Sequence, residues 1–401
     1  MNILVINAGS SSLKYQLFNM TSGEVIAKGL CERIGTGGTV IHKVPGREPY
    51  REQVPIADHY NALERVVELL LDPEHGVISS LDEIDAIGHR VAHGGEKYRQ
   101  SARADEQMVQ YLTSIIPINP LHGPPAIAGI EGCLKLFGST PQAAVFDTAF
   151  YADLTPDKYV YALPYEYYSQ HGIRKFGFHG TSHRYVTALA AQVCGRDVQS
   201  MKIITCHLGN GSSITAVDGG KAIDTTMGFT PQDGVPMGTR SGSVDPTVLP
   251  YIMKLDGIGA EQCEELINKR SGLLGVSGVS GDIRDVEDKA FNGGDERCKL
   301  ALGILYTAVK KYIGAFAAEL NGLDCLVFTA GIGEHDPELR EAVCANMEYL
   351  GIAIDNEKSY GAKRGSITDI TAPGSRVRVL VLPTDEEKMI ALDTQKLCER
   401  R

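Results

Sequence analysis

The sequence predicts an α/β protein made of two related halves, each built on a mixed β-sheet. Helical and strand-like segments alternate, a strand–turn–strand pattern occurs twice, and no low-complexity linker interrupts the chain. A length of 401 residues favours two or three domains over a single core. We therefore place a domain boundary after residues 147–149. Residues 1–149 and 385–401 form the predicted N-terminal domain, and residues 150–384 form the C-terminal domain.

The repeated hairpin is the main evidence for duplication. An apolar, β-branched run at residues 2–6 leads through a turn of small residues to a second run at 13–18, and a similar pattern returns at 202–217. The letters Gly-Ser-Ser at 9–11 align with those at 211–213. Gly and Ser are common in turns, so one match means little. Two matches, each between apolar strands, indicate related halves.

Helical periodicity marks most of the remaining chain. Apolar spacing of about 3.6 residues predicts helices over residues 61–71, 184–193, 260–267 and 301–320. A strand over 325–328, a turn at 331–333, a helix from Pro337, a buried strand over 377–382 and a last helix carrying Glu386 and Glu387 complete the second half.

Composition excludes several classes of protein. The net charge of −11 disfavours a nucleic-acid binder, which normally carries a basic face. Nine cysteines without a C-x-x-C pair indicate buried free thiols rather than disulfides or a zinc site. The N-terminus lacks the basic segment of a signal peptide. The most apolar stretch, residues 304–320, is broken by Lys310 and Lys311, so we expect no membrane span and a cytoplasmic protein.

Two glycine- and serine-rich turns are candidate phosphate-binding loops. The first spans residues 7–14, where Ser10, Ser12 and Lys14 offer hydroxyls and an ammonium; the second spans residues 207–213. Neither is a Walker A loop, because the Gly-Lys-Ser/Thr ending is missing. A plain hairpin turn is the alternative for each.

Arginine, aspartate and histidine complete a set of groups suited to phosphoryl transfer. Arg90 has flanking histidines and a Gly-Gly pair, Arg240 lies between small residues, Asp147 ends an apolar strand, and His179 follows an aromatic pair. Such transfer depends mainly on positioning and on neutralising charge. The alternatives are solvated arginines and a hydrogen-bonded core histidine.

Taken together, the motifs closely resemble those of the acetokinase family, which belongs to the superfamily of sugar kinases, actin and heat-shock chaperones. The resemblance runs nearly end to end and rests on NAGSSSLK, GHRVAHGGEKY, FDTAF, YALPYEYY, GIRKFGFHGTSH, HLGNGSS, MGTRSG and GIGE. It implies two ribonuclease-H-like domains with an active-site cleft between them, and a homodimer. It also implies reversible in-line transfer of the ATP γ-phosphoryl to acetate, giving ADP and acetyl phosphate for acetyl-CoA biosynthesis.

The resemblance also implies roles for the matching residues. The catalytic residues are Asp147, His179 and Arg240. Asn7 and Glu386 are the positions that bind magnesium (or manganese), which is held together with ATP or ADP. The acid is bound by Arg90 and by an apolar pocket of Ala92, Leu121, Phe178 and Pro231. The nucleotide contacts are Lys14, His207, Leu208, Gly209, Asn210, Gly211, Asp282, Ile283, Arg284, Gly331, Ile332, Gly333, Glu334 and His335.

Several positions depart from the family pattern. Ala92 replaces a usual Val, which enlarges the acid pocket and leaves a propionate kinase or a broad short-chain acid kinase as the alternative. The other departures are Gly123, Tyr151, His335 and Asp385, together with Val235, Pro236 and Ser243 near Arg240. A third hypothesis is an actin-like ATPase, which would need the nucleotide loops but not Arg90.

Overall fold

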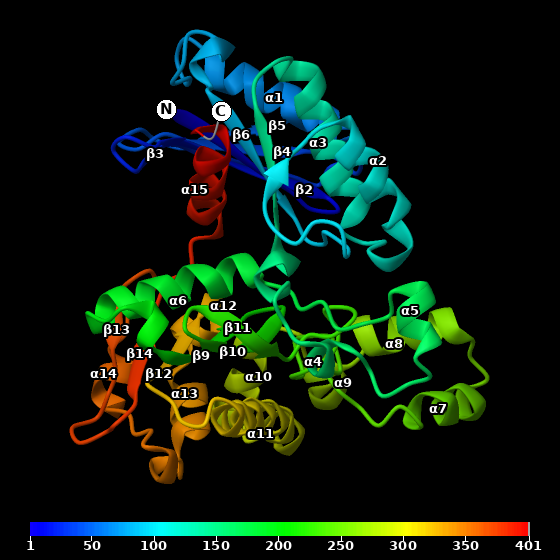
Figure 1. The fold of residues 1–401 in the computed structure, drawn as a ribbon, viewed down its shortest axis with the longest axis vertical. Coiled ribbons are helices and arrows are strands. Elements are labelled where there is room, and N and C mark those ends of the chain that lie inside the picture. The colour runs from blue at the N-terminus through cyan, green and yellow to red at the C-terminus, as the bar shows by residue number, and fades with distance from the viewer. Residues whose placement is uncertain (400–401) are drawn as a thin grey trace. The chain divides into compact units, whose positions relative to one another are not determined.

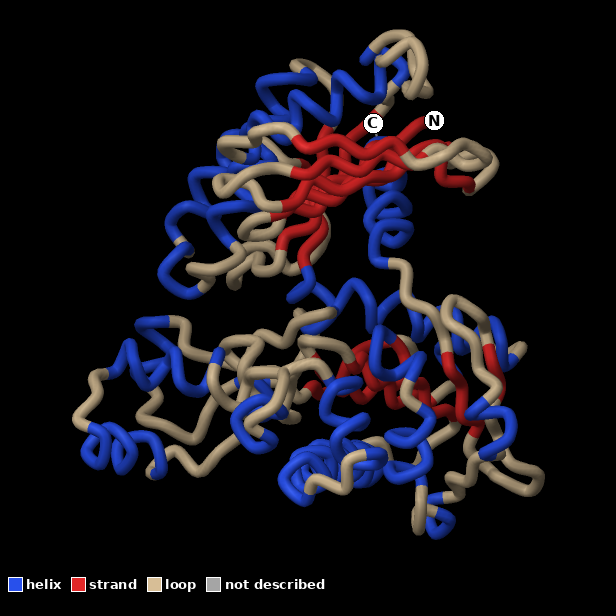
Figure 2. The backbone as a smooth tube through the Cα atoms, turned by 180° about the vertical axis from the view of Figure 1, so that it is seen from behind, coloured by secondary structure: helices blue, strands red, loops and turns tan. Residues whose placement is uncertain are grey.

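A computed structural model describes residues 1–399, which form two compact units. The first contains residues 1–152 together with those from 385 onward, and the second contains residues 153–384 (Figure 1). Each unit is a mixed β-sheet with helices packed against it, as the tube coloured by secondary structure makes plain (Figure 2).

The first unit has an eight-stranded sheet in the order β5-β4-β3-β2-β1-β6-β8-β7. Its strands are β1 Asn2–Ala8, β2 Ser12–Asn19, β3 Glu24–Glu32, β4 Thr39–Lys43, β5 Tyr50–Gln53, β6 Ala86–Val91, β7 Ala102–Arg103 and β8 Gln142–Phe146. Its helices are α1 His59–Leu71, α2 Glu106–Ser114, α3 Gly123–Phe137 and α15 Glu386–Glu399, with short turns η1 Leu81–Glu83, η2 Ile116–Ile118 and η3 Asp147–Tyr151.

Strand β1 is buried on both faces, which explains its unbroken apolar sequence. Leu4 and Ile6 belong to the core under α1 and α3. Ile3 and Val5 point the other way and pack with Ile390 of α15. The last helix of the described chain is therefore a core element of the first unit.

Gly88 of β6 allows α15 to lie close to the sheet. A Cβ at this position would be 2.4 Å from Thr394 Oγ1 and 2.7 Å from Ile390 Cγ2. Any larger residue would push the helix off the strand.

The second unit has a six-stranded sheet in the order β11-β10-β9-β12-β14-β13. Its strands are β9 Lys202–Leu208, β10 Ser212–Asp218, β11 Lys221–Thr225, β12 Cys325–Thr329, β13 Thr368–Asp369 and β14 Arg378–Val381. Its helices are α4 Pro156–Tyr159, α5 Glu166–His171, α6 Gly180–Cys194, α7 Val248–Asp256, α8 Ala260–Lys269, α9 Gly272–Ser277, α10 Ile283–Glu287, α11 Glu296–Glu319, α12 Ala330–His335, α13 Pro337–Cys344 and α14 Asn356–Tyr360, with short turns η4 Val198–Ser200, η5 Asp288–Asn292 and η6 Glu348–Leu350.

The two sheets share one core topology, which confirms the predicted duplication. The order β3-β2-β1-β6-β8 in the first matches β11-β10-β9-β12-β14 in the second. Within these five strands of each sheet, the first three along the chain pair in antiparallel fashion. The fourth strand pairs in parallel with the first, and the fifth pairs in parallel with the fourth.

The predicted alignment of the two turns is wrong by two residues. Gly9 and Gly209 each directly follow the incoming strand, whereas Gly211 directly precedes the outgoing one. Ala8 pairs with Leu13 in the first hairpin, and Leu208 pairs with Ser212 in the second. The sequence alignment matched the two Gly-Ser-Ser strings by residue type. The strand register instead makes Gly9 equivalent to Gly209. Four residues then separate the last paired residues of the first hairpin, and three separate those of the second.

The turn predicted at residues 331–333 is also wrong, because these residues lie in helix α12. Two glycines disfavour a helix by intrinsic propensity. Here Ala330, with a φ of 66°, turns the chain sharply after β12, and α12 then packs against β9. Tertiary packing outweighs propensity.

Helix α11 forms the core of the second unit. By length and composition it is, among the described residues, the one helix that could cross a membrane. Eight of its side chains, from Cys298 to Ala317, are buried against the sheet and its neighbouring helices. A core helix with this much apolar surface meets the same criterion, and we assign α11 to the core.

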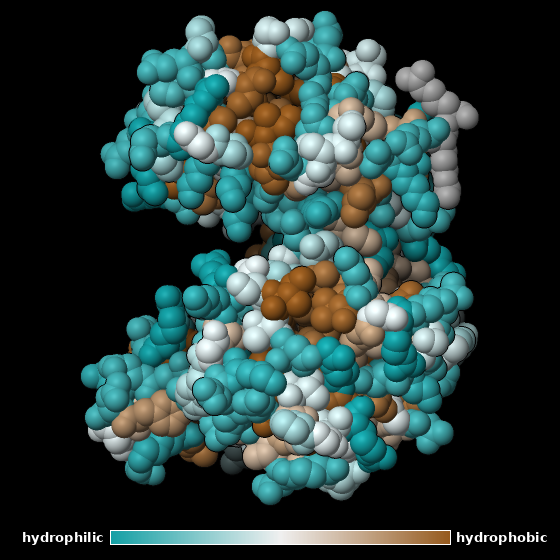
Figure 3. Space-filling view, turned by 90° about the vertical axis from the view of Figure 1, so that its left-hand side faces the viewer, coloured by the Kyte–Doolittle hydropathy of each residue, from teal (hydrophilic) through white to brown (hydrophobic). Residues whose placement is uncertain are grey.

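The surface of each unit is mostly hydrophilic, with local hydrophobic patches on the face shown in Figure 3. All nine cysteines are free thiols, and seven of them are buried.

Candidate active site

Arg90, Asp147 and Glu386 meet at one edge of the first unit's sheet. Arg90 lies near the end of β6, Asp147 directly follows β8, and Glu386 begins α15. Because β6 and β8 are parallel, their carboxyl ends lie at the same edge. Arg90 donates from Nη2 and Nε to Asp147 Oδ2, at 2.8 and 3.2 Å. Its Nε also lies 3.4 Å from Glu386 Oε2.

This cluster contains more negative than positive charge. One guanidinium faces two carboxylates, and Asp147 is 2% exposed. Burial raises the pKa of the Glu386 carboxyl to about 7; Arg90 lowers it, and Asp147 adds to the rise. Burial lowers the pKa of Arg90, but the two carboxylates outweigh burial and raise it. A further cation would therefore be stabilised beside Glu386.

The histidines that flank Arg90 do not contribute to an anion site. His89 is buried and donates from Nε2 to Gln142 Oε1, 2.8 Å away. Burial lowers its pKa to about 4, although the Gln142 hydrogen bond raises it, so the imidazole is neutral. His93 is also buried, and its Nδ1 accepts a hydrogen bond from Gly95 N. Both histidines therefore have partners within the first unit, whereas Arg90 faces the two carboxylates.

The first hairpin turn brings Asn7 and Lys14 together. These residues are register partners across β1 and β2. Helix α15 packs against β1, and the Lys14 ammonium lowers the pKa of Glu386 through space. Gly9 N donates to Ser12 O across the turn at 2.8 Å, and Ser10 and Ser11 are exposed. Asn7 and Glu386 supply oxygen ligands of the kind that magnesium prefers.

In the second unit, His179 is held in a strained backbone conformation. Its φ of 58° is one of only five positive values among the described residues other than glycine. It immediately precedes α6, and its Nδ1 lies 2.9 Å from Ser213 Oγ of β10. Non-glycine residues adopt this conformation where the surrounding structure requires it, which is typical of functional sites.

A polar network behind His179 was missed by the sequence analysis. Ser213 Oγ also lies 2.7 Å from His183 Nε2, and His183 Nδ1 lies 2.6 Å from Thr205 Oγ1. Burial lowers the pKa of His183 well below its usual value, and His207 lowers it further, so the ring is neutral. His183 lies one helical turn after His179, and that spacing could have revealed it.

His207 stacks on His179, with ring centroids 4.2 Å apart and planes inclined by 21°. Its Nδ1 lies 2.7 Å from Ser182 Oγ, and that hydroxyl is also 2.7 Å from Thr384 Oγ1. The two histidines therefore restrict each other to one orientation.

Gly211 lies between His179 and Arg240. A Cβ at Gly211 would be 3.1 Å from His179 Cε1 and 3.7 Å from Arg240 Nη1. Arg240 donates from Nη1 to Pro231 O at 3.1 Å, and no described carboxylate forms an ion pair with it. Burial lowers the pKa of its guanidinium. A partly desolvated guanidinium without a carboxylate partner is suited to binding an anion.

Further contacts connect the predicted nucleotide-binding segments. A Cβ at Gly209 would be 3.9 Å from Ala330 Cβ, next to the segment 331–335. A Cβ at Gly238 would be 2.5 Å from Gly281 O, next to residues 282–284. Arg284 forms an exposed ion pair with Asp282 at 2.5 Å. The predicted residues of the second unit thus lie along one continuous set of contacts.

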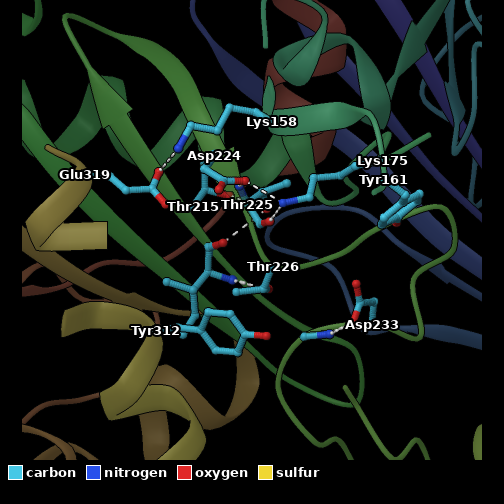
Figure 4. Close-up of polar contacts among 12 residues, drawn as sticks. Lys158, Tyr161, Lys175, Thr215, Asp224, Thr225, Thr226, Asp233, Tyr312 and Glu319 are labelled. Carbon is cyan, nitrogen blue, oxygen red and sulfur yellow. Dashed lines mark hydrogen bonds and ion pairs between the residues drawn. The ribbon is translucent and has the colours of Figure 1, made fainter. Parts of the chain in front are cut away.

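An ion pair anchors the segment that leads to His179 (Figure 4). Lys175 Nζ points at Asp224 Oδ1 of β11, 2.6 Å away, and donates to Thr225 O at 3.1 Å. Tyr161 adds a second anchor because its hydroxyl accepts from Phe229 N at 2.8 Å. These contacts fix residues 176–179 against the sheet.

The predicted acid pocket is divided between the two units. Ala92 and Leu121 belong to the first, where Ala92 is half-buried and Leu121 is 61% exposed. Phe178 and Pro231 belong to the second. Phe178 packs with Met227 and Met237. Each unit taken by itself contributes two of the four residues.

Most departures from the family pattern have simple structural roles. Asp385 Oδ1 accepts from Lys388 N at 2.9 Å and so caps α15, as Asn would. His335 donates from Nδ1 to Gly331 O at 2.6 Å, and Tyr151 is buried. Nothing in the structure requires Gly at position 123, because a Cβ there would make only ordinary contacts.

Comparison with known proteins identifies the family. The model of the acetokinase family matches residues 2–392. The chain belongs to the acetokinase family. It is therefore an ATP-dependent phosphotransferase, and the predicted reaction class is confirmed.

Two curated relatives illustrate the similarity. The acetate kinase of Clostridium beijerinckii is 50% identical over 398 residues, which is 99% of this chain and all of the relative. The acetate kinase of Methanosarcina mazei is 51% identical over 401 residues, covering the whole chain and 97% of the relative.

Solved structures of the acetokinase family support the fold. The acetate kinase of Porphyromonas gingivalis superposes with a TM-score of 0.94 and is 45% identical in sequence. A propionate kinase from Francisella tularensis superposes with a TM-score of 0.91 and is 39% identical. Each comparison covers 99% of both chains. The predicted duplicated ribonuclease-H-like fold is confirmed.

Proposed function

We propose that this acetokinase-family chain transfers the γ-phosphoryl group of ATP reversibly to acetate, giving ADP and acetyl phosphate. The observation that carries the proposal is that His179 and Arg240 both lie close to Gly211, in a glycine-rich turn that directly follows the buried strand β9. Such a turn offers backbone N–H groups to a phosphate, and the two side chains offer positive hydrogen-bond donors.

The two units have different tasks. The first unit, residues 1–152 with those from 385 onward, supplies Arg90 for the acid and Lys14 for the nucleotide, and the second, residues 153–384, supplies the other nucleotide contacts together with Phe178 and Pro231 of the acid pocket. The nucleotide contacts are Lys14, His207 to Gly211, Asp282 to Arg284 and Gly331 to His335.

Arg90 holds the acid. Its Nε and Nη2 are directed at Asp147 and Glu386, which leaves Nη1 to bind a carboxylate. Asp147 positions this guanidinium rather than acting as a base. A carboxylic acid is already ionised at neutral pH, so no proton has to be removed from it. The family resemblance assigns Ala92, Leu121, Phe178 and Pro231 to its methyl group.

Transfer proceeds in line, without a phosphoenzyme. A carboxylate oxygen of acetate forms the new P–O bond while the bond between the γ-phosphorus and the bridging oxygen breaks, and the electron pair leaves with ADP. His179 and Arg240 bind the equatorial oxygens, whose negative charge they stabilise. Ser213 holds the His179 ring at the required angle.

Asn7 and Glu386 fit a magnesium or manganese ion. Their oxygen atoms suit a hard cation, and the excess negative charge around Glu386 favours one. When bound, the ion neutralises charge on the ATP phosphates. Glu386 and Asn7 orient it, and Lys14 adds a second positive charge at the same edge of the sheet.

The experiment is hydroxamate trapping of the acyl phosphate with ATP, magnesium and acetate. We expect hydroxamate to form with the wild-type protein, whereas an actin-like ATPase would release phosphate without it. Arg90→Ala should mainly raise KM for acetate, and Arg240→Ala should mainly lower kcat. The opposite pattern would contradict the assigned roles, and ATP hydrolysis without hydroxamate would contradict the proposal.

A propionate kinase, or a broad short-chain acid kinase, is the second candidate, favoured by Ala92. Val at this position would fill space beside the methyl end of the acid, and one buried CH₂ contributes about 0.8 kcal/mol, or roughly fourfold in kcat/KM. The similar structure from Francisella tularensis is a propionate kinase. Kinetics with acetate and propionate test this, and Ala92→Val should shift preference towards acetate. An unchanged ratio would exclude Ala92 as the determinant.

We further propose a cytoplasmic homodimer that binds neither nucleic acid nor membrane. The net charge of −11 disfavours anionic partners. Large hydrophobic side chains are exposed on and beside α5 and α7, which suits a protein interface. They are Leu163, Tyr165, Tyr167, Val248, Tyr251 and Leu255. Light scattering of the purified protein should give twice the chain mass.

A further inference from the structure

Three carboxylates gather in the second unit, away from the residues assigned to catalysis. Glu287 ends α10, Asp336 lies between α12 and α13, and Glu338 is in the first turn of α13. One oxygen of each lies within 4.8 Å of the others. The hydroxyl of Tyr306, on α11, lies 3.5 Å from Glu287 Oε1.

Asp336 has a buried oxygen with no hydrogen-bond donor. Its side chain is 4% exposed, and Oδ1 accepts from Leu339 N at 2.7 Å, which caps α13. No N–H or hydroxyl donor within the described part of the chain reaches Oδ2. A buried acceptor without a partner is costly, so this oxygen calls for a ligand.

The only nearby arginine is engaged elsewhere among the described residues. Arg340 is buried and donates from Nη1 to Gly333 O at 2.9 Å, from Nε to Ser359 Oγ at 3.0 Å and from Nη2 to Ser359 O at 2.6 Å. None of these three hydrogen bonds reaches the carboxyl groups of Glu287, Asp336 or Glu338.

We propose that Glu287, Asp336 and Glu338 form a binding site for a hard divalent cation, Mg²⁺ or Ca²⁺. Each supplies one oxygen, and water or the Tyr306 hydroxyl completes the coordination. The cation gives Asp336 Oδ2 its missing partner. The site is separate from the pair Asn7 and Glu386, which belongs to the other unit.

The position of the site gives it a structural role. Glu287 lies three residues after Arg284, and Asp336 directly follows His335. A cation bound here joins the two segments assigned to the nucleotide, residues 282–284 and 331–335. This role rests on the proposed function, whereas binding of the cation does not.

Terbium luminescence of the full-length protein tests the site. Tb³⁺ replaces Ca²⁺ at oxygen sites, and the chain has no tryptophan, so tyrosines such as Tyr306 sensitise its emission. We expect saturable emission without nucleotide, displaced by Ca²⁺ or Mg²⁺. Glu287→Gln with Glu338→Gln should weaken Tb³⁺ binding at least about tenfold. The control Glu261→Gln with Glu264→Gln, on the exposed face of α8, should leave this emission unchanged.

Two further variants keep the test decisive. Tyr306→Phe should reduce emission but leave the stoichiometry of Ca²⁺ binding by calorimetry unchanged. Should the double variant not fold, Glu338→Gln alone gives the same comparison, since Glu338 is only half-buried. Equal Tb³⁺ affinity in wild type and variants would overturn the proposal, as would Tb³⁺ binding that neither Ca²⁺ nor Mg²⁺ displaces. A change in nucleotide affinity without a change in cation binding would also overturn it.

Discussion

Replacing Gly211 by Ala adds a single methyl group beside the two side chains assigned to the transferring phosphoryl. The new Cβ would lie 3.1 Å from His179 Cε1 and 3.2 Å from Nε2. Carbon atoms normally approach to about 3.5–4.0 Å, so the ring must move by roughly half an ångström. The hydrogen bond to Ser213 and the stacking on His207 oppose that movement. The backbone of Gly211 has an ordinary φ, so Ala causes no strain there.

A displacement of 1 Å at a reacting centre can cost about 100-fold in rate, so half of it should cost about tenfold, or ~1.4 kcal/mol. We expect kcat for hydroxamate formation to fall by this factor while KM for acetate changes less than about twofold. Gly303→Ala is the matched control, because it adds the same methyl on the exposed side of α11 with no atom within 4 Å. A Gly211→Ala protein with wild-type kcat would refute the assigned position of His179.

Three other predictions follow from contacts within one unit. Ser213→Ala removes the hydrogen bond to His179 Nδ1 and should lower kcat about tenfold with little change in KM for acetate; a stability loss without a kcat loss would contradict this. Arg340→Met removes three buried hydrogen bonds and should lower the free energy of unfolding by about 3 kcal/mol, measured by urea denaturation, and weaken ADP binding because Gly333 loses its anchor. The Cys325 hydrogen bond lowers the pKa of Cys194 to about 7 against the effect of burial, so iodoacetamide should label Cys194 increasingly as pH rises through 7. Cys325→Ala should move that midpoint to higher pH, and Cys194→Ser should abolish the labelling.

The reaction class could be predicted from the sequence because each motif is a contiguous stretch of residues. His179 precedes Gly-Thr-Ser and Arg240 lies between Thr239 and Ser241, so local sequence strongly affects the backbone conformation at both positions, whereas Arg90 lies within strand β6. The duplicated hairpin was visible for the same reason, since both strands and the turn are adjacent in the chain. Its internal alignment was not visible, because strand register is fixed by pairing rather than by letters.

Long-range contacts explain what the sequence did not reveal. The link from His179 through Ser213 to His183 joins a helix start to a strand more than 30 residues away. The acidic cluster of Glu287, Asp336 and Glu338 depends on how α10 and α13 pack. Helix α12 was missed because its glycines indicate a turn, and only packing on β9 makes it helical.

Helix α15 belongs to the first unit, although the whole second unit separates it from β8 along the chain. A ribosome adds about 5–20 residues per second and makes the chain in order. The contiguous second unit can therefore finish folding before Ile390 is synthesised. Until then, the face of the first sheet that contains Ile3 and Val5 remains uncovered. Glu386 arrives with the same helix, so Arg90 and Asp147 acquire their third partner only once translation has passed both units. Newly made protein thus completes the cluster of Arg90, Asp147 and Glu386 late, and a nascent chain stalled before α15 would expose an apolar sheet face to chaperones.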